Sequence, residues 1–290
     1  MGELLLPKEI FARNYRHLSY GRFGSIIAAM RAARSEFKHI RFQIFNYAAH
    51  ISLDHPPYNV LSIPLMEELA NAIEGLNGDG NIKCIVLDST SPKAFSAGIS
   101  LEDSRQNRVF QTLEAFTRVF QSIAEISKPL VVAVNGPAIG AGSELVAFGD
   151  VVIATPNARF AQPEVKMGVF PPFAAVMLPA LIGPKKAYEL ILTGQSLTAE
   201  EAQSLGFVNQ VVPEADLPRA VASMVERIGA FSAPVLEMTK AAIASSVGVP
   251  LHLALKQSQN IYLNQLMDLE DVQEGLRARL EQRKPVWKNK

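Results

Sequence analysis

The sequence predicts an α/β domain built on parallel strands, and three observations lead to that prediction. Short apolar runs rich in β-branched residues recur along the chain, as at residues 82–88 and Leu130–Val134, and indicate buried strands. Segments in which apolar residues recur with helical spacing separate these runs, as at residues 107–126. Clusters of glycine, proline and asparagine mark the turns. A strand–helix–strand alternation of this kind is typical of parallel sheets covered by helices.

The first elements follow from alternation and capping. Apolar and polar side chains alternate over residues 42–53, which predicts a strand or a hairpin that ends at the turn Asp54-His55-Pro56-Pro57. Ser62 then has the character of a helix N-cap, and Pro64 fits the first turn, so a helix is expected to run to about Leu76. The turn cluster at residues 77–80 leads into the strand at residues 82–88.

The central stretch, residues 128–178, is the part around which the chain is organised. After Leu130–Val134, the turn Asn135-Gly136-Pro137 and a run of small residues lead into a helical pattern that begins near Glu144. A second apolar run, Val151–Ala154, is followed within a few residues by Glu164. Two carboxylates therefore come from the ends of successive elements, next to glycine or proline. With free backbone N–H groups nearby, they could transfer protons beside a polarised carbonyl.

The C-terminal third is expected to be helical. Thr198 with Glu201 three residues later forms a capping-box pattern at the start of a helix. Beyond Leu217 the pattern is helical, with breaks at residues 232–234 and 248–250.

Composition limits the classes of function. Of the 290 residues 48% are hydrophobic, enough for a sizeable core, and 28 basic residues balance 28 acidic ones. This balance gives no electrostatic argument for a nucleic acid as partner. Cys84 is the only cysteine, which excludes an intrachain disulfide and fits a cytoplasmic protein. No apolar window reaches the length of a membrane span, and the histidines lack metal-ligand spacing, so neither a membrane nor a metal is expected.

Four motifs in this order resemble the crotonase (enoyl-CoA hydratase/isomerase) superfamily. They are K-A-F-S-A-G-I-S at residues 93–100, V-N-G-P-A-I-G-A-G-S-E-L at 134–145, A-R-F-A-Q-P-E-V-K-M-G-V at 158–169, and L-T-G-Q-S-L-T-A-E-E-A at 192–202. The resemblance covers the chain from about Phe42 to its end. It implies a fold of repeated ββα units with a C-terminal helical segment that assembles a homotrimer or a dimer of trimers.

The resemblance also implies the site. Glu144 and Glu164 match the two glutamates that hold a water in hydratases of this superfamily. The backbone N–H groups of Ile99 and Ala141 match the oxyanion hole. Ala97, Gly98, Gly140, Phe170 and Lys284 are expected to bind the substrate, an acyl-CoA thioester, and no separate cofactor is expected. Taken alone, Glu144 could be a first-turn glutamate and Glu164 a solvated loop carboxylate.

Two departures from the common hydratase pattern indicate a branch. The usual glycine-rich loop after the second glutamate is replaced by Gly-Val-Phe-Pro-Pro-Phe at residues 168–173, and Ser100 stands where an acidic residue is common. These features and the C-terminal pattern resemble the cyclohexa-1,5-diene-1-carbonyl-CoA hydratases of aromatic compound degradation. The alternatives are another acyl-CoA reaction, such as isomerisation or hydrolysis, or a non-catalytic binding protein.

Three segments are expected: an N-terminal extension at 1–38, a core domain at 39–200 and a helical segment at 201–290. The extension has no counterpart in the family pattern and contains seven basic residues and three glutamates. We expect a flexible or loosely docked tail, with a short helix near residues 25–33, or a start codon assigned too early, with Met30 as the alternative. Its likeness to a transit peptide is weak because of the glutamates.

Overall fold

The structure is a computed structural model that describes residues 37–290, and the expectations for the preceding tail lie outside the described residues. The strands are β1 (Ile40–Phe45), β2 (Ala48–Leu53), β3 (Cys84–Ser89), β4 (Leu130–Val134), β5 (Ala138–Ile139), β6 (Val151–Ala154), β7 (Arg159–Ala161), β8 (Ser196–Thr198) and β9 (Gln210–Val211). The helices are α3 (Ile63–Glu74), α4 (Val109–Glu125), α5 (Ala141–Ala147), α6 (Ala174–Ile182), α7 (Pro184–Thr193), α8 (Ala199–Ser204), α9 (Leu217–Gly229), α10 (Ala233–Ala244), α11 (Leu251–Asn264) and α12 (Glu270–Leu280), with short 3-10 helices η2 (Glu164–Met167), η3 (Glu214–Asp216) and η4 (Leu266–Asp268).

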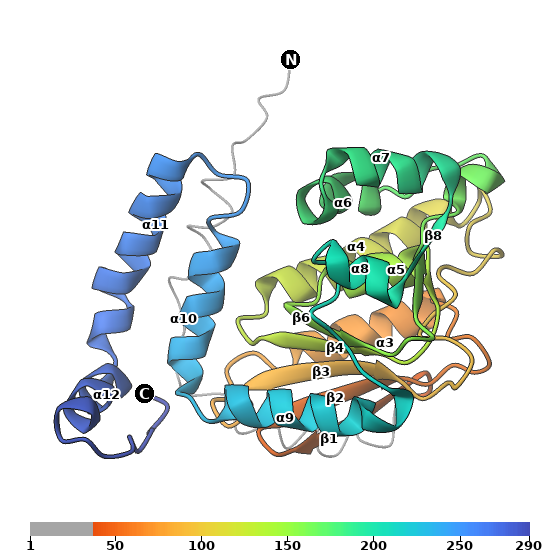
Figure 1. Ribbon diagram of the computed structural model, residues 1–290. Coiled ribbons are helices and arrows are strands. Elements are labelled where there is room, and N and C mark those ends of the chain that lie inside the picture. The colour runs from red at the N-terminus through yellow and green to blue at the C-terminus, as the bar shows by residue number, and fades with distance from the viewer. Residues whose placement is uncertain (1–36) are drawn as a thin grey trace. The chain divides into compact units, whose positions relative to one another are not determined.

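A six-stranded sheet forms the centre, in the order β1-β2-β3-β4-β6-β9. Strands β2, β3, β4, β6 and β9 pair in parallel, and β1 adds an antiparallel edge through the hairpin with β2. Helices connect the parallel strands, as Figure 1 shows for α3 and α4. The predicted α/β fold is confirmed, and the carboxyl ends of β2, β3 and β4 lie side by side at one edge.

The two faces of the sheet bury different side chains because successive residues of a strand point to opposite sides. Ile85 and Leu87 of β3 belong to the larger core cluster, which also contains the buried faces of α3 and α4. Cys84 and Val86 belong to a smaller cluster with Leu217, Val221 and Val225 of α9. The continuous apolar runs of the sequence therefore reflect strands covered on both faces.

A second, three-stranded sheet stands beside the first and carries the site motifs. Its order is β5-β7-β8, with β5 parallel and β8 antiparallel to β7. A single bridge joins Ser96 to Ala138, so the loop after β3 also pairs with this sheet. The short strands place the residues after Ile139 and after Ala161 next to each other, and these are the residues that lead to the two glutamates.

The capping predictions hold. Ser62 caps α3 by accepting the N–H of Leu65, and Thr198 and Glu201 form the predicted capping box on α8. The two predicted breaks separate α9 from α10 and α10 from α11. Helices α6 and α7 were not predicted from the sequence. Helix α6 is apolar on nearly every side and contains Pro179, so it has no helical stripe.

Helix α10 is tied to the core by two ion pairs. The fully buried Lys128 contacts Glu237 at 3.1 Å, and Lys240 contacts Asp150 at 2.7 Å. Within residues 37–290, no helix is long and apolar enough to cross a membrane.

Candidate active site

Two backbone segments from different elements meet at the candidate site. Gly98 has a φ of +85°, and a Cβ built on it would lie 2.7 Å from the carbonyl oxygen of Ile139 and 3.4 Å from the nitrogen of Ala141. Only glycine permits this conformation and this approach together. The segment that follows β3 therefore lies directly against the segment that opens α5.

The two predicted oxyanion donors lie in these segments with their N–H groups uncommitted. The carbonyl of Gly98 accepts from Leu61 at 2.8 Å and Ser100 donates to Leu61 at 3.4 Å, which leaves the N–H of Ile99 between them. Ala141 is the first residue of α5, where an N–H has no intrahelical acceptor. Within the described residues neither N–H has a hydrogen-bond partner. Both are therefore available to a ligand oxygen.

Glu144 lies in the first turn of α5, a helix in which every residue is buried. Its Oε1 accepts the N–H of Ala174 at 2.7 Å, so the amino end of α6 fixes the carboxylate. Burial raises the pKa of Glu144 to about 7, the negative charge of Glu164 adds to the rise, and the N–H groups of Ala174 and Phe173 oppose it. The side chain is therefore close to half ionised at neutral pH, as a proton-transfer group should be.

Glu164 opens η2 directly after Pro163, and its carboxylate reaches back to α5. A Cβ on Gly140, whose φ is +55°, would lie 2.5 Å from Oε1 of Glu164, so only glycine leaves room for the carboxylate. Its Oε2 is buried and has no hydrogen-bond partner among the described residues. Burial raises the pKa of Glu164 as well. The two carboxylates thus form an interacting pair that resists losing both protons.

Phe173 was not singled out from the sequence, yet it anchors the chain that holds Glu144. Its ring packs against Phe116 and Phe120 of α4, with centroids 5.0 and 4.4 Å apart, and Phe120 stacks on Phe148 at 4.0 Å. The residue after Phe173 is Ala174, the donor to Glu144. The two prolines before Phe173 signal a stiff turn but do not show where its ring would pack.

The other predicted binding residues differ in how close they lie to the candidate site. Ala97 is exposed beside Gly98, and Gly140 is buried against Glu164. Phe170 is 69% exposed, on the loop after η2. Lys284 follows α12, in a segment whose Trp287 and Asn289 bond to residues 230 and 233, so within this chain the structure does not bring it to the glutamates.

Gln162 is a buried polar residue that the motif reading passed over. Its side chain is 1% exposed, and neither its amide nitrogen nor its oxygen has a partner within residues 37–290. It lines a small cavity together with Ser143, Leu178 and Phe207. Ser143 precedes Glu144 and Gln162 lies two residues before Glu164, but neither glutamate lines this cavity.

Comparison with known proteins identifies the family. The enoyl-CoA hydratase/isomerase family matches residues 44–290. A probable mitochondrial enoyl-CoA hydratase of Dictyostelium discoideum is 33% identical over 250 residues, which cover 83% of this chain and 87% of that protein. The 2,3-dehydroadipyl-CoA hydratase of Escherichia coli K12 is 31% identical over 234 residues, with 80% and 91% covered. An enoyl-CoA hydratase structure from Bacillus anthracis superposes with a TM-score of 0.83 at 29% identity, covering 87% of this chain and 100% of that one.

This chain belongs to the enoyl-CoA hydratase/isomerase family. The predicted crotonase-type fold with a helical C-terminal region is confirmed, and so is the prediction of an enzyme of the enoyl-CoA hydratase type. The assignment to one branch of the family, the division into three segments and the roles of the individual residues stay predictions.

Proposed function

We propose that this protein adds water to an α,β-unsaturated CoA thioester through Glu144 and Glu164. One observation carries the proposal: two carboxylates of raised pKa interact beside two uncommitted N–H groups, those of Ile99 and Ala141. The family and the hydratase names of its relatives support the same reaction. An isomerase needs only one proton-transfer group, so a pair of carboxylates favours hydration.

In this mechanism the thioester oxygen accepts from both N–H groups. As water adds to the β-carbon, negative charge moves onto that oxygen, and the donors stabilise the enolate without reorganising. Each donor is worth about 3 kcal/mol by analogy with other oxyanion holes. Gly98 lets the two donor segments lie against each other, and Gly140 leaves room for the Glu164 carboxylate beside them.

The two glutamates divide the proton transfers. Glu144, fixed by Ala174, accepts a proton from the water, and Glu164 delivers a proton to the α-carbon. Burial raises the pKa of both carboxyls, and the charge of Glu164 raises the pKa of Glu144 further, so the pair resists losing both protons. The division requires that Glu164 carry a proton while Glu144 is ionised. For every water added, one proton leaves the water and one reaches carbon, so the pair keeps the same number of protons. The proton gained by Glu144 must then pass to Glu164, directly or through solvent, to restore the starting state.

The acyl group that we propose is a cyclic dienoyl thioester. The proposal rests on the resemblance of residues 168–170, Ser100 and the C-terminal pattern to the cyclohexadiene-carbonyl-CoA hydratases. Support comes from Pro172, which stands where the common hydratase loop has glycine, and from Phe173, whose ring packs on Phe116 and Phe120. A stiffer, bulkier loop favours a compact acyl group over a long flexible chain. A role in aromatic degradation follows from this branch as a prediction, and the cytoplasmic location stays the prediction made from the single cysteine.

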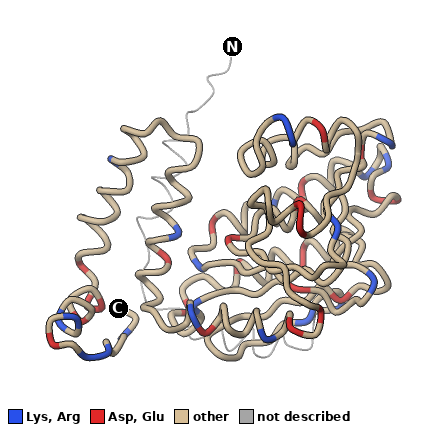
Figure 2. Tube along the Cα trace, in the orientation of Figure 1, with Lys and Arg blue, Asp and Glu red and all other residues tan. Residues whose placement is uncertain are grey.

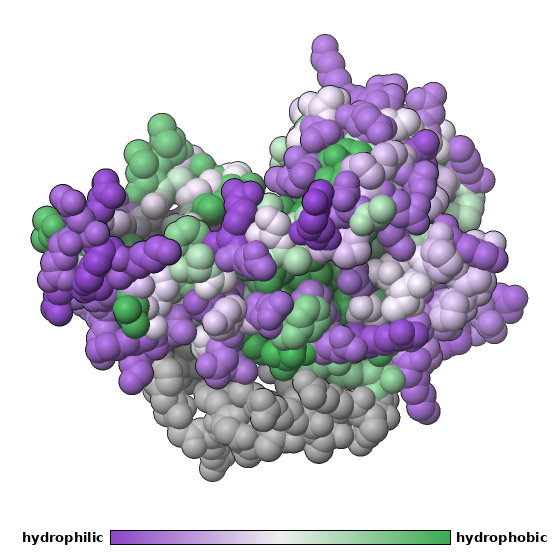
Figure 3. Space-filling view, turned by 60° about the horizontal axis from the view of Figure 1, so that its bottom comes forward, coloured by the Kyte–Doolittle hydropathy of each residue, from purple (hydrophilic) through white to green (hydrophobic). Residues whose placement is uncertain are grey.

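We further propose assembly into trimers, singly or in pairs, through the C-terminal helices. Helix α11 carries a single charged side chain, Lys256, and Figure 2 shows how little charge lies along it. In Figure 3 some hydrophobic residues lie among hydrophilic ones at the left edge. The exposed large apolar side chains of this segment include Ile243, Val247, Leu251, Leu255, Tyr262, Leu263 and Leu280. An apolar surface of this kind is typical of subunit interfaces. Sedimentation equilibrium tests this: a monomer would contradict it.

The experiment that tests the reaction is a panel of CoA thioesters followed by absorbance as the conjugated enoyl group is lost. We expect hydration of crotonyl-CoA and faster hydration of cyclohexa-1,5-diene-1-carbonyl-CoA. Turnover of crotonyl-CoA alone would keep the reaction and reject the cyclic substrate. Isomerisation or hydrolysis without hydration would reject the reaction. Failure to turn over any thioester, together with retention of RNA on a filter, would favour the binding-protein alternative.

A further inference from the structure

Asn59 occupies the turn between β2 and α3, and its backbone takes a conformation that few side chains tolerate. Its φ angle is +47°, in the left-handed region, and the residue is fully buried. Asparagine is one of the few residues besides glycine that adopt this conformation readily. Glycine would satisfy the backbone equally well, so the buried amide has a separate use.

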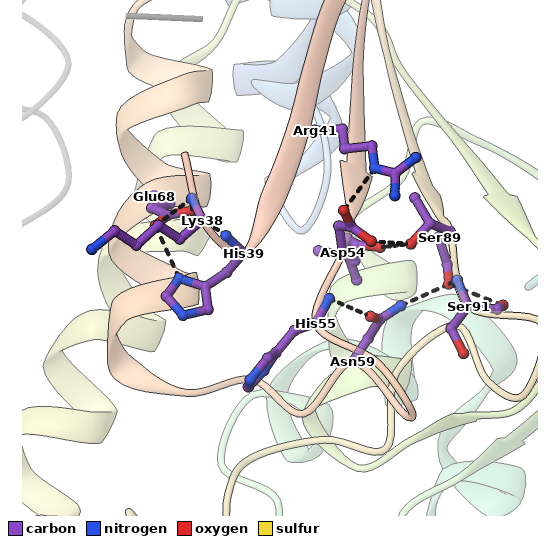
Figure 4. Close-up of polar contacts among 11 residues, drawn as sticks. Lys38, His39, Arg41, Asp54, His55, Asn59, Glu68, Ser89 and Ser91 are labelled. Atoms are coloured by element: carbon purple, nitrogen blue, oxygen red, sulfur yellow. Dashed lines mark hydrogen bonds and ion pairs between the residues drawn. The ribbon is translucent and has the colours of Figure 1, made fainter. Parts of the chain in front are cut away.

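The side chain of Asn59 joins three pieces of chain. Its Oδ1 accepts the N–H of His55 at 2.8 Å, and its Nδ2 donates to Ser89 Oγ at 2.7 Å and to the carbonyl of Phe95 at 3.0 Å. Ser89 Oγ in turn donates to the carbonyl of Ala94 at 2.9 Å. Figure 4 shows Asn59 between His55 and two serines, Ser89 at the end of β3 and Ser91 just after it. The amide thus ties the turn after β2 to the loop after β3.

The backbone around Asn59 continues this link to Gly98. The carbonyl of Asn59 accepts from Ser96 Oγ at 2.7 Å, and the same Oγ accepts the N–H of Gly98 at 3.2 Å. The carbonyl of Tyr58 accepts the N–H of Ala97 at 2.9 Å. Every residue from Phe95 to Gly98 is therefore bonded to the Asn59 turn, directly or through one hydroxyl.

The braced loop also contacts the other half of the site. The carbonyl of Ser96 accepts the N–H of Ile139 at 2.9 Å, and Ile139 lies two residues before Ala141. A shift of the loop would therefore change the separation between the N–H groups of Ile99 and Ala141. Donors that stabilise a developing oxyanion must be held in place before the charge forms.

We propose that Asn59 is a positioning residue for the oxyanion hole, holding the loop at residues 94–99 so that the N–H groups of Ile99 and Ala141 converge on one oxygen. This inference rests on the proposed function, because it needs a thioester carbonyl between the two donors. Asn59 itself does not touch the substrate; it acts through Phe95 and Ser96.

Aspartate is the informative replacement. Asn59→Asp keeps the size and the left-handed tolerance but removes both N–H donors, and it sets a carboxylate against the carbonyl of Phe95. Asn59→Gly keeps the backbone conformation and deletes the side-chain bonds. The matched control is Asn46→Asp, because Asn46 also has a left-handed backbone, with φ of +50°, but is exposed in the hairpin at the opposite end of β2.

The test measures kcat and KM for hydration of crotonyl-CoA and the absorbance maximum of bound cinnamoyl-CoA, which moves to longer wavelength as its carbonyl is polarised. We expect Asn59→Asp to lower kcat by about 10- to 100-fold, less than deletion of a donor, and to shrink the absorbance shift. KM should stay within about threefold, since CoA is held elsewhere. Asn59→Gly should show a smaller loss of both, and Asn46→Asp none.

Three results would decide the matter. A folded Asn59→Asp variant with the kcat and absorbance shift of the wild type overturns the inference while the hydratase function stands. A wild-type protein that neither hydrates the thioester nor shifts cinnamoyl-CoA overturns both. If Asn59→Asp does not fold, Ser89→Ala removes one arm of the brace, and the inference then requires a loss of about 3- to 10-fold in kcat with a smaller absorbance shift.

Discussion

The surroundings of Glu144 and those of Glu164 differ, although both side chains would serve one water. Glu144 comes from a helix that is buried throughout, and the N–H of Ala174 holds its Oε1. Glu164 opens a 3-10 helix in which Val165 and Met167 are 40% and 57% exposed, and its Oε2 has no partner in the described part of the chain. The fold thus holds one carboxylate by a hydrogen bond within a buried helix, while the other belongs to a short segment with exposed neighbours.

Among substitutions outside the two glutamates, the largest effect is expected where Gly98 lies against Ile139. Gly98→Ala would push a methyl group against the carbonyl of Ile139 and force an unfavourable φ, which separates the two N–H donors. We expect a loss of about 10²- to 10³-fold in kcat, the usual cost of losing one oxyanion donor. Steady-state kinetics with crotonyl-CoA measures it.

Gly206→Ala is the matched control for that substitution. Gly206 has a φ of +80° but nothing within 4 Å of a Cβ, so it tests backbone strain without the collision. It should cost about 1 kcal/mol of stability and leave kcat unchanged. Equal losses of kcat in both variants would mean that strain alone, and not the approach to Ile139, sets the activity.

Loosening the support of Glu144 should have an intermediate effect. Phe173→Ala deletes the ring that packs on Phe116 and Phe120 and thereby frees the Ala174 N–H. That N–H lowers the pKa of Glu144, so its loss raises the pKa. We expect the acid limb of the kcat/KM profile to move to higher pH, with a loss of about 10-fold near pH 7 that is recovered partly at higher pH.

Phe207→Leu controls for a general loss of aromatic packing. Phe207 packs on Phe160 at 5.1 Å, outside the cluster that holds residue 173. It should lower the melting temperature without moving the profile. If it shifts the acid limb as much as Phe173→Ala does, the anchor has no special role.

Glu144 should also weaken the folded state, and the effect has a defined dependence on pH. Its pKa is about 7 when folded and that of an ordinary glutamate when unfolded, so the folded state binds the proton more tightly. The contribution of Glu144 to the free energy of unfolding is therefore fully present below about pH 4.5 and is lost as the pH rises through 7. Glu144→Gln should therefore be more stable than the wild type by about 1–3 kcal/mol at pH 8, with no difference near pH 4. Thermal unfolding of the variant and the wild type at pH 4 and pH 8 tests this. The same difference in stability at both pH values would contradict a raised pKa of Glu144.

The smallest effect on activity is expected from a substitution in the exposed loop after η2. Phe170→Ala removes a ring that is 69% exposed, so stability should not change measurably. If this ring contacts the acyl group, the ratio of kcat/KM for cyclic and linear thioesters should change by about 2- to 10-fold. Val176→Ala, at 76% exposure, should leave that ratio unchanged. The same ratio in both variants would remove Phe170 from the predicted binding residues.

The features that the sequence predicted correctly are those that depend on residues close together in the chain. The strand at Leu130–Val134, the Ser62 cap and the capping box at Thr198 depend on residues next to each other, and all are confirmed. The approach of Gly98 to Ile139 joins residues about 40 positions apart. The resemblance to a family indicated that these segments belong to one site, which no local pattern contains.

The supports of the site could not be predicted for a related reason. Asn59 and Phe173 act through bonds and packing to chain far away in sequence, and neither residue type signals such a role. An asparagine in a turn predicts a left-handed backbone but not the serine and the carbonyl that its amide contacts. A Pro-Pro-Phe run predicts a turn but not an aromatic cluster with α4.

The central claim is that Glu144 and Glu164 transfer protons, and the direct measurement is kcat for hydration in Glu144→Gln and Glu164→Gln alongside the Kd of a substrate-like thioester. Both substitutions keep the size of the side chain, so folding should survive. Each should lower kcat by about 10²- to 10⁴-fold with little change in Kd. Near wild-type hydration in either variant would contradict the account, and a loss of binding as large as the loss of turnover would show that the carboxylates are structural.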